Sequence, residues 1–336
     1  MLASAPLSAW KHTCRARASL PRAAPAARAL AVRQRQRQRR PGRGMAAAPR
    51  AGASDVFVLD FDGVLVDSEP EVSTSAFDAA RDYWPAAFAS ADGAAKEAVL
   101  QGLRECRPVL VRGYESMVMA RLLVERPGAA AGILGGWEEL LPATLEAWGE
   151  DWLTLQRSFE EHRAGWLDRD RAGWLACNTP YPGVFEALAA CEAPFYIASS
   201  KAAHRVAALA TGVLGVPLAQ DSPRLFCSLL PPNEKKVEAL RAIEQRPVCE
   251  GARLHFVDDR LETLKAAVEA GLAGRWGLYL ADWGYCTEEE KAEAAALPGV
   301  RRLALRDFLE LLKWGLVAGV DDGCEPTEEE VRGGVK

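Results

Sequence analysis

The sequence predicts an α/β protein with a doubly wound parallel sheet, into which an α-helical segment is inserted after the first strand. One indication is a set of short apolar runs, such as 55–61 and 254–257, which lack the alternation of half-exposed strands. A second is that helical segments alternate with these runs, as in successive βα units. A third is the stretch 71–178, which is rich in Ala, Leu, Trp and Glu and has a helical pattern.

The helical insert, residues 71–178, follows the first expected strand at 55–61. Proline and glycine positions divide the insert into helices expected at about 71–83, 93–105, 114–125, 137–148 and 151–168. An insert of this size between the first strand and the rest of the sheet predicts a second structural unit beside the α/β core.

The α/β core is expected to comprise residues 55–70 and 179–314. Beyond the insert, strands are expected at 194–198, 254–257, 276–280 and 302–305, and helices at about 234–243, 261–270, 287–296 and 307–312, with a further helix that ends near 212. Residues 315–336 are acidic and contain several glycines, which predicts a disordered tail.

Residues 1–54 form a basic leader. They contain twelve Lys or Arg and neither Asp nor Glu, and they are also rich in Ala and Pro. Because the continuous apolar centre of a secretory signal is missing, this composition favours an organelle transit peptide. The alternative is a disordered basic arm that binds RNA, since Arg alternates with Gln over 33–39.

The remaining residues, 55–336, have 29 Lys or Arg against 46 Asp or Glu, a formal charge of −17. This acidic balance argues against a broad nucleic-acid-binding surface. No apolar run reaches the length of about 18 residues that a membrane span requires, so none is expected. The eight cysteines and four histidines are scattered without a Cys-x-x-Cys pair, which argues against a zinc site or a disulfide framework.

Polar side chains follow three of the expected strands. Asp60 and Asp62 end the first strand on the same side, because alternate residues of a strand point the same way. Ser199 follows the second strand, and Asp258 and Asp259 follow the third. Since parallel sheets bind ligands beyond the carboxyl ends of their strands, these side chains should converge. Close acids repel unless a cation lies between them, which predicts a divalent metal, a catalytic role or both; the alternative is a polar turn.

With these motifs the chain resembles the haloacid dehalogenase superfamily, specifically its phosphatase branch with a helical cap. Four signatures occur in order within residues 56–313. They are Asp60-x-Asp62-Gly63, Ser199 at a strand end, a lysine at a helix start (Lys235 or Lys236), and the pair Asp258-Asp259. The order of the four signatures carries the resemblance, because each alone is a weak signal.

The resemblance implies a Mg²⁺-dependent reaction through an aspartyl-phosphate. Asp60 would be the nucleophile, and Asp62 would act as general acid and then general base. Mg²⁺ would bind Asp60, the backbone carbonyl of Asp62 and Asp259, and Asp258 would either bind it directly or support these ligands. Dehalogenases lack an acid at the position of Asp62, so its presence favours phosphate-ester chemistry.

The resemblance also implies a phosphate cradle. Ser199 would donate a hydrogen bond to the phosphate, and Gly63 would contribute from the backbone. A lysine at a helix start would neutralise the transferred charge. Lys236 fits the spacing of the family better, with Lys235 as the alternative.

Substrate selectivity is expected to come from the helical insert. Arg107, Arg112 and Tyr114 lie close together around a break in the helical pattern, and an Arg-rich loop there would bind a carboxylate or a second phosphate of the substrate. The alternative is a solvated charged face. Elsewhere, Lys201 fits the pattern of the family but is interpreted as a helix-start charge rather than a catalytic group, and His255 is interpreted as a core histidine.

The expected function is therefore a Mg²⁺-dependent hydrolase of a small-molecule phosphate ester, and phosphoglycolate phosphatase is the nearest familiar activity in this branch. The alternatives are a sugar-phosphate phosphomutase and, in another class, a non-catalytic metabolite-sensing or interaction protein with the same fold. The segment 278–285 also looks like uncharacterised members from photosynthetic organisms. The plastid is accordingly the expected destination of the leader, with the mitochondrial matrix as the alternative.

Overall fold

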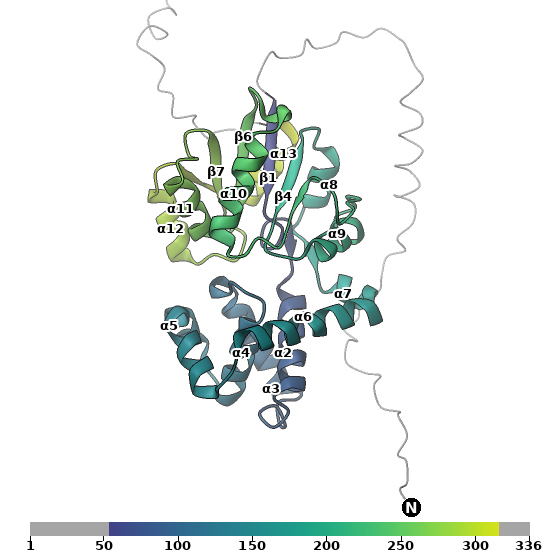
Figure 1. Cartoon of the computed structure of the whole chain (residues 1–336), viewed down its shortest axis with the longest axis vertical. Helices are drawn as coiled ribbons and strands as arrows, with labels where there is room; N and C mark the ends of the chain where they lie inside the picture. The colour runs from purple at the N-terminus through teal and green to yellow at the C-terminus, as the bar shows by residue number, and fades with distance from the viewer. Residues whose placement is uncertain (1–53, 316–336) are drawn as a thin grey trace, which may run out of the picture. The chain divides into compact units, whose positions relative to one another are not determined.

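The computed structural model describes residues 54–315, so the predicted leader and the predicted tail fall outside the described residues except at Ser54 and Gly315. Six strands form the central sheet of the α/β core (Figure 1). In spatial order they are β5 (Leu225–Phe226), β4 (Phe195–Ala198), β1 (Asp55–Leu59), β6 (Arg253–Asp258), β7 (Trp276–Ala281) and β8 (Val300–Leu303). All pairings between neighbouring strands are parallel, which confirms the predicted doubly wound sheet.

Helices cover both faces of this sheet. One face packs against α8 (Val184–Ala190), α9 (Ala203–Gly212) and α13 (Leu305–Trp314), and the other against α10 (Pro232–Glu244), α11 (Leu261–Glu269) and α12 (Glu288–Ala296). Phe57 and Leu59 of β1 belong to the first of these layers, whereas Val56 and Val58 belong to the second. Burial on both faces explains why the strand is apolar without alternation.

The helical insert runs from α2 to α7. Its helices are α2 (Glu69–Tyr83), α3 (Ala94–Glu105), α4 (Glu115–Glu125), α5 (Ala130–Trp148), α6 (Trp152–Arg169) and α7 (Arg171–Ala176), and a short 3-10 turn, η1 (Arg107–Val109), follows α3. The first five helices share a hydrophobic cluster whose buried members lie between Val72 and Phe159. This cluster is separate from the two layers that cover the sheet, so the insert has a core of its own.

Two short strands join the insert to the α/β core. In β2 (Val66–Asp67) the chain leaves the core, and in β3 (Thr179–Pro180) it returns. The strands are antiparallel, with Val66 opposite Pro180 and Asp67 opposite Thr179. Through β2, α2 begins only seven residues after Asp62 in the chain.

Two expected boundaries were wrong. The last strand is β8, two residues earlier than the expected 302–305, and the helix after it begins at Leu305 rather than 307. Leu303 and Leu305 are both apolar, so periodicity alone cannot divide strand from helix there. The helix expected at 137–148 lies within α5, whose backbone is not helical at Gly136 (φ −164°, ψ 37°), so the break predicted at this glycine is present and a preceding helical segment begins at Ala130.

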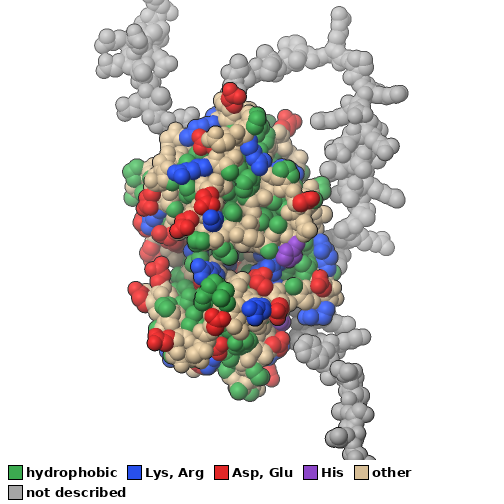
Figure 2. Space-filling view, viewed as in Figure 1, with side chains coloured by type: hydrophobic (Ala, Val, Ile, Leu, Met, Phe, Trp, Pro, Cys, Tyr) green, Lys and Arg blue, Asp and Glu red, His purple; other side chains and the backbone are tan. Residues whose placement is uncertain are grey.

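Other features concern the surface and the remaining turns. Among the described residues, none of the helices has the length and apolar character needed to cross a membrane. Figure 2 shows acidic and basic side chains interspersed over the displayed face of the molecule. A second short turn, η2 (Pro247–Cys249), precedes β6.

Candidate active site

The carboxyl ends of three adjacent strands bring the predicted motifs together. In the register of the sheet, Leu59 of β1 lies opposite Ile197 of β4 and Val257 of β6. The residues that follow each of these positions therefore meet at one edge of the sheet. They include Asp60 and Asp62 after β1, Ser199 after β4, and Asp258 with Asp259 at the end of β6.

Asp60, Asp258 and Asp259 form an acidic cluster. Each offers a carboxylate oxygen within 4.8 Å of the others, and the three residues are 6%, 0% and 2% exposed. Burial, and then the neighbouring acids, raise the pKa of Asp60 to about 7 and that of Asp259 to about 6. Three buried carboxylate donors at this spacing fit a hard divalent cation such as Mg²⁺, which would relieve both the desolvation and the mutual repulsion.

Backbone amides orient each carboxylate of this cluster. Asp60 Oδ1 accepts the N–H of Phe61 at 2.7 Å, and Asp258 Oδ1 accepts the N–H of Arg260 at 3.0 Å. Asp259 Oδ2 accepts the N–H of Tyr285 at 2.8 Å. The second oxygens of Asp60 and Asp258 both contact the ammonium of Lys236, so each of these carboxylates is held at both of its oxygens.

Gly63 makes room for Asp259. Its φ is +83°, and a Cβ built there would lie 1.9 Å from Asp259 Oδ2. Its N–H donates to the carbonyl of Val66 at 3.0 Å, inside the turn. The structure thus gives Gly63 a steric role beside Asp259, and its contact with phosphate stays a prediction. The need for glycine at this position comes from the tertiary structure, because Asp259 lies almost two hundred residues further along the chain.

Of the two candidate lysines, Lys236 reaches the cluster. Its Nζ lies 2.8 Å from Asp60 Oδ2 and 2.7 Å from Asp258 Oδ2, and the residue is 1% exposed. Burial alone would lower the pKa of Lys236, but Asp258 and Asp60 outweigh it and hold that pKa above its usual range. Lys235 instead points outward and pairs with Glu238.

Lys201 contacts Asp62, which corrects its interpretation as a helix-start charge. Its Nζ lies 3.2 Å from Asp62 Oδ1, and its side chain is 3% exposed. The backbone N–H of Lys201 also donates to Ser199 Oγ at 3.2 Å, and Ser199 is buried beside it. A signal for this role was present, because Lys201 is the third residue after the carboxyl end of β4.

A cleft of about 260 Å³ opens above these groups. Asp60, Asp62, Lys201, Lys236 and Asp259 contribute to its wall from the α/β core. The helical insert contributes residues of the loop 107–113 and of α6. The core therefore supplies the reactive carboxylates, while the insert encloses the space in front of them.

The loop 107–114 carries the predicted selectivity residues, and the structure separates them. Arg107 and Arg112 line the cleft, where Arg107 lies over the ring of Tyr285 at 4.0 Å and Arg112 over the ring of Trp152 at 5.3 Å. Tyr114 is 3% exposed and belongs to the core of the insert. Its ring lies 6.0 Å from that of Trp152, and Tyr114 is not among the described residues that line the cleft.

Two contacts hold this loop in place. Glu115 Oε2, at the start of α4, accepts the N–H of Val111 at 3.0 Å. On the other side, Arg260 Nη1 donates to the carbonyl of Leu110 at 2.9 Å, from the residue directly after Asp259. The loop is consequently connected both to the insert and to the acidic cluster.

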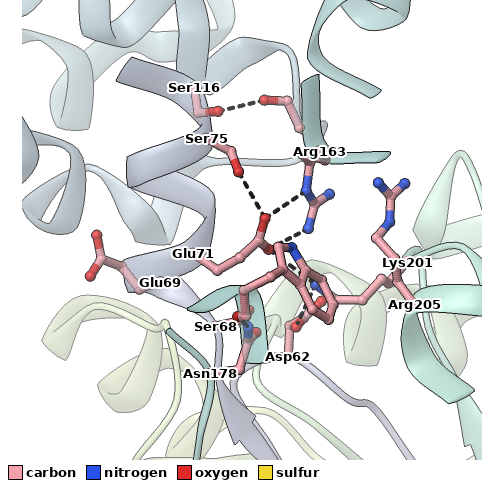
Figure 3. Close-up of polar contacts among 12 residues, drawn as sticks. Asp62, Ser68, Glu69, Glu71, Ser75, Ser116, Arg163, Asn178, Lys201 and Arg205 are labelled. Carbon is pink, nitrogen blue, oxygen red and sulfur yellow. Dashed lines mark hydrogen bonds and ion pairs between the residues drawn. The ribbon is translucent and has the colours of Figure 1, made fainter. Parts of the chain in front are cut away.

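Sequence reasoning missed several charged residues of the site (Figure 3). Arg163 of α6 forms a bidentate pair with the buried Glu71 of α2, and Arg205 of α9 pairs with Glu160 of α6. These residues lie on helices whose charged positions look like solvated faces in sequence. His255, in contrast, is a buried histidine as expected, stacked on Phe57.

Comparisons with known proteins give one family match. The profile of haloacid dehalogenase-like hydrolases matches residues 54–271, more than half of the chain. No curated protein sequence matches significantly.

The chain is also similar to solved structures, at low sequence identity. A haloacid dehalogenase-like family hydrolase from Streptococcus pneumoniae is 14% identical, with a TM-score of 0.47 and coverage of 79% of this chain and 99% of that one. A predicted phosphatase from Clostridium acetobutylicum is 12% identical, with a TM-score of 0.46 and coverage of 77% and 98%. A predicted phosphoglycolate phosphatase from Haemophilus somnus is 15% identical, with a TM-score of 0.43 and coverage of 69% and 87%.

Proposed function

This chain belongs to the haloacid dehalogenase-like hydrolase family, and we propose that it is a Mg²⁺-dependent phosphatase that hydrolyses a small-molecule phosphate ester. The observation that carries the proposal is the buried cluster of Asp60, Asp258 and Asp259 with Lys236 in contact with two of its members. Phosphoryl transfer needs concentrated positive charge beside an oxygen nucleophile, and this cluster supplies the ligands and a fixed ammonium.

Asp60 is the proposed nucleophile. One of its oxygens is fixed by the N–H of Phe61, and the other faces the cleft beside Lys236. That oxygen forms the bond to phosphorus as the bond from phosphorus to the leaving alcohol breaks, which gives an aspartyl-phosphate. Asp60, Asp259, Asp258 and the backbone carbonyl of Asp62 would hold Mg²⁺, which lowers the repulsion between carboxylate and phosphate.

Asp62 is the proposed general acid and base. It lies in the wall of the cleft next to Asp60, with Lys201 against one of its oxygens. Asp62 gives a proton to the leaving alcohol and then takes a proton from the water that hydrolyses the aspartyl-phosphate. Halide departure needs no such proton, so an acid here supports ester hydrolysis over dehalogenation.

The organic part of the substrate is proposed to carry an anion, as in phosphoglycolate. Arg107 and Arg112 enter the cleft from the insert, and neither forms an ion pair among the contacts of the described residues. Guanidinium groups bind carboxylates and phosphates in a bidentate fashion. A substrate that joins a phosphate to a carboxylate or a second phosphate would place its phosphate at the acidic cluster and its other anion at these arginines.

A panel of phosphate esters, assayed with Mg²⁺ and then with excess chelator, tests the proposal on protein that lacks the leader. We expect hydrolysis of at least one ester, abolished by chelator and by Asp60→Asn. Asp282→Asn, at the end of the neighbouring β7, serves as the matched control and should retain activity. Full activity of Asp60→Asn would refute the mechanism, and isomerisation of glucose 1-phosphate without release of phosphate would indicate a mutase.

The leader is proposed to direct the protein to the plastid. The support is its composition, since residues 1–54 are basic and contain no acid. Fusion of residues 1–54 to a fluorescent protein tests this in plant cells. Import into mitochondria would identify the matrix instead, and a diffuse cytosolic signal would rule out targeting by the leader.

A further inference from the structure

A chain of alternating charges connects Asp62 with the helical insert (Figure 3). Lys201 Nζ lies 3.2 Å from Asp62 Oδ1 and 3.9 Å from Glu71 Oε2. Asp62 and Lys201 belong to the α/β core, whereas Glu71 lies in the first turn of α2. Because the side chain of Lys201 is 3% exposed, its ammonium relies on these two carboxylates in place of water.

Glu71 is itself rigidly held. It is 0% exposed, and Arg163 donates to both of its oxygens, from Nε at 2.9 Å and from Nη2 at 2.6 Å. Ser75 Oγ donates to Oε1 at 2.9 Å. Although burial acts in the opposite direction, Arg163 and Lys201 lower the pKa of Glu71 to about 2. Glu71 is therefore a fixed negative charge on the far side of Lys201 from Asp62.

We propose that Glu71 is a positioning residue for Asp62 and that it acts through Lys201. The inference rests on the proposed function, in which Asp62 gives its proton to the leaving oxygen as the bond from that oxygen to phosphorus breaks and the bond to Asp60 forms. Glu71 draws the ammonium of Lys201 toward the insert, so that Lys201 engages one oxygen of Asp62 and leaves the other for the leaving group. Without the charge on Glu71, both oxygens of Asp62 compete for the ammonium.

The test compares two substrates of nearly the same shape, phenyl phosphate and p-nitrophenyl phosphate. Phenolate is a poor leaving group that benefits from protonation by Asp62, whereas p-nitrophenolate leaves readily without a proton. The quantity measured is kcat/KM, because it covers the steps up to departure of the phenol and excludes the later hydrolysis of the aspartyl-phosphate. A defect in the acid thus appears as a difference between the two substrates.

Glu71→Gln keeps the size of the side chain and removes its charge. Since a general acid contributes roughly 10²- to 10⁴-fold, we expect loss of its positioning to lower kcat/KM for phenyl phosphate by roughly tenfold or more. The value for p-nitrophenyl phosphate should stay within about twofold of the wild type. Lys201→Met should show the same selective loss, and adding Glu71→Gln to it should have little further effect, because both act on Asp62 by one route.

Glu69→Gln is the matched control. Glu69 also lies in the first turn of α2, is buried, and pairs with a serine and an arginine, Ser73 and Arg104. The contacts of the described residues include none between Glu69 and Lys201, and Figure 3 shows the side chain of Glu69 pointing away from Lys201. Any loss in this variant should therefore be the same for the two substrates.

A second variant covers the case in which Glu71→Gln does not fold because Arg163 is left without its partner. Glu71→Gln/Arg163→Gln removes both charges and should show the same selective loss. Equal loss on both substrates, or no loss on either, would overturn the inference. Failure of the wild type to hydrolyse any phosphate ester would instead overturn the proposed function, so the two failures are distinguishable.

Discussion

Asp60→Asn should stabilise the protein at pH 8 when metal is removed, although it abolishes the proposed nucleophile. Burial is the largest contribution that raises the pKa of Asp60, from 3.8 to about 7, and Asp258 and Asp259 add to it while Lys236 opposes it. One pKa unit corresponds to about 1.4 kcal/mol, so ionised Asp60 costs the folded state up to about 4 kcal/mol relative to the unfolded chain. Asparagine has no charge to desolvate.

The sign of this effect depends on pH in a defined way. Because the pKa of Asp60 is higher in the folded state, its cost is absent well below pH 3.8, grows as the pH rises toward 7, and is constant above that. The advantage of the Asn variant should accordingly be about 4 kcal/mol at pH 8 and about 2 kcal/mol at pH 5. Added Mg²⁺ should reduce or reverse it, because the ion stabilises the wild type more than the variant.

Urea unfolding followed by circular dichroism, at pH 5 and pH 8 with chelator, measures these differences. Asp282→Asn provides the control, since Asp282 is partly exposed and its contact with Arg302 spans 3.4 Å. Its free energy of unfolding should change by no more than about 0.5 kcal/mol at either pH. If Asp60→Asn is less stable than the wild type at pH 8 in chelator, or if its advantage is the same at both pH values, ionised Asp60 does not destabilise the folded state as expected.

Three further predictions concern the surroundings of the site. Gly63→Ala should weaken Mg²⁺ binding roughly tenfold or more by calorimetry, because the new Cβ would collide with Asp259 and displace a metal ligand; unchanged affinity would contradict the proposed role of Asp259. Arg163→Met should lower the free energy of unfolding by roughly 3–5 kcal/mol, because it removes the bidentate cationic partner of the buried Glu71, and a loss below about 1 kcal/mol would show that Glu71 is solvated or protonated. Burial raises the pKa of Cys227 to about 12, so iodoacetamide at pH 8 should modify it in urea but not in the folded protein, as read by mass spectrometry.

The local sequence was sufficient to predict which strand ends form the site. Asp60 and Asp62 had to leave the strand together, because side chains alternate along a strand. The apolar strand and the βα alternation also required a parallel sheet, whose carboxyl ends meet at one edge. The convergence of Asp60, Ser199 and Asp258 could therefore be expected without coordinates.

The tertiary structure decided which charges belong to the site. Lys235 and Lys236 are adjacent in sequence, and only the orientation of α10 places Lys236 against Asp60 while Lys235 faces solvent. Arg163 and Glu71 lie 92 residues apart. In sequence each looks like an exposed charge on a helix, because no local pattern records which face of α2 meets α6.

The sequence by itself determined the sheet, the carboxylates at its edge and the presence of a helical insert, because these follow from periodicity and short-range geometry. The structure decided the partners of those carboxylates. Gly63 leaves space for Asp259, and Asp62 is connected to Glu71 through Lys201. Such contacts depend on how separate elements pack, and packing brings together residues whose spacing along the chain carries no signal.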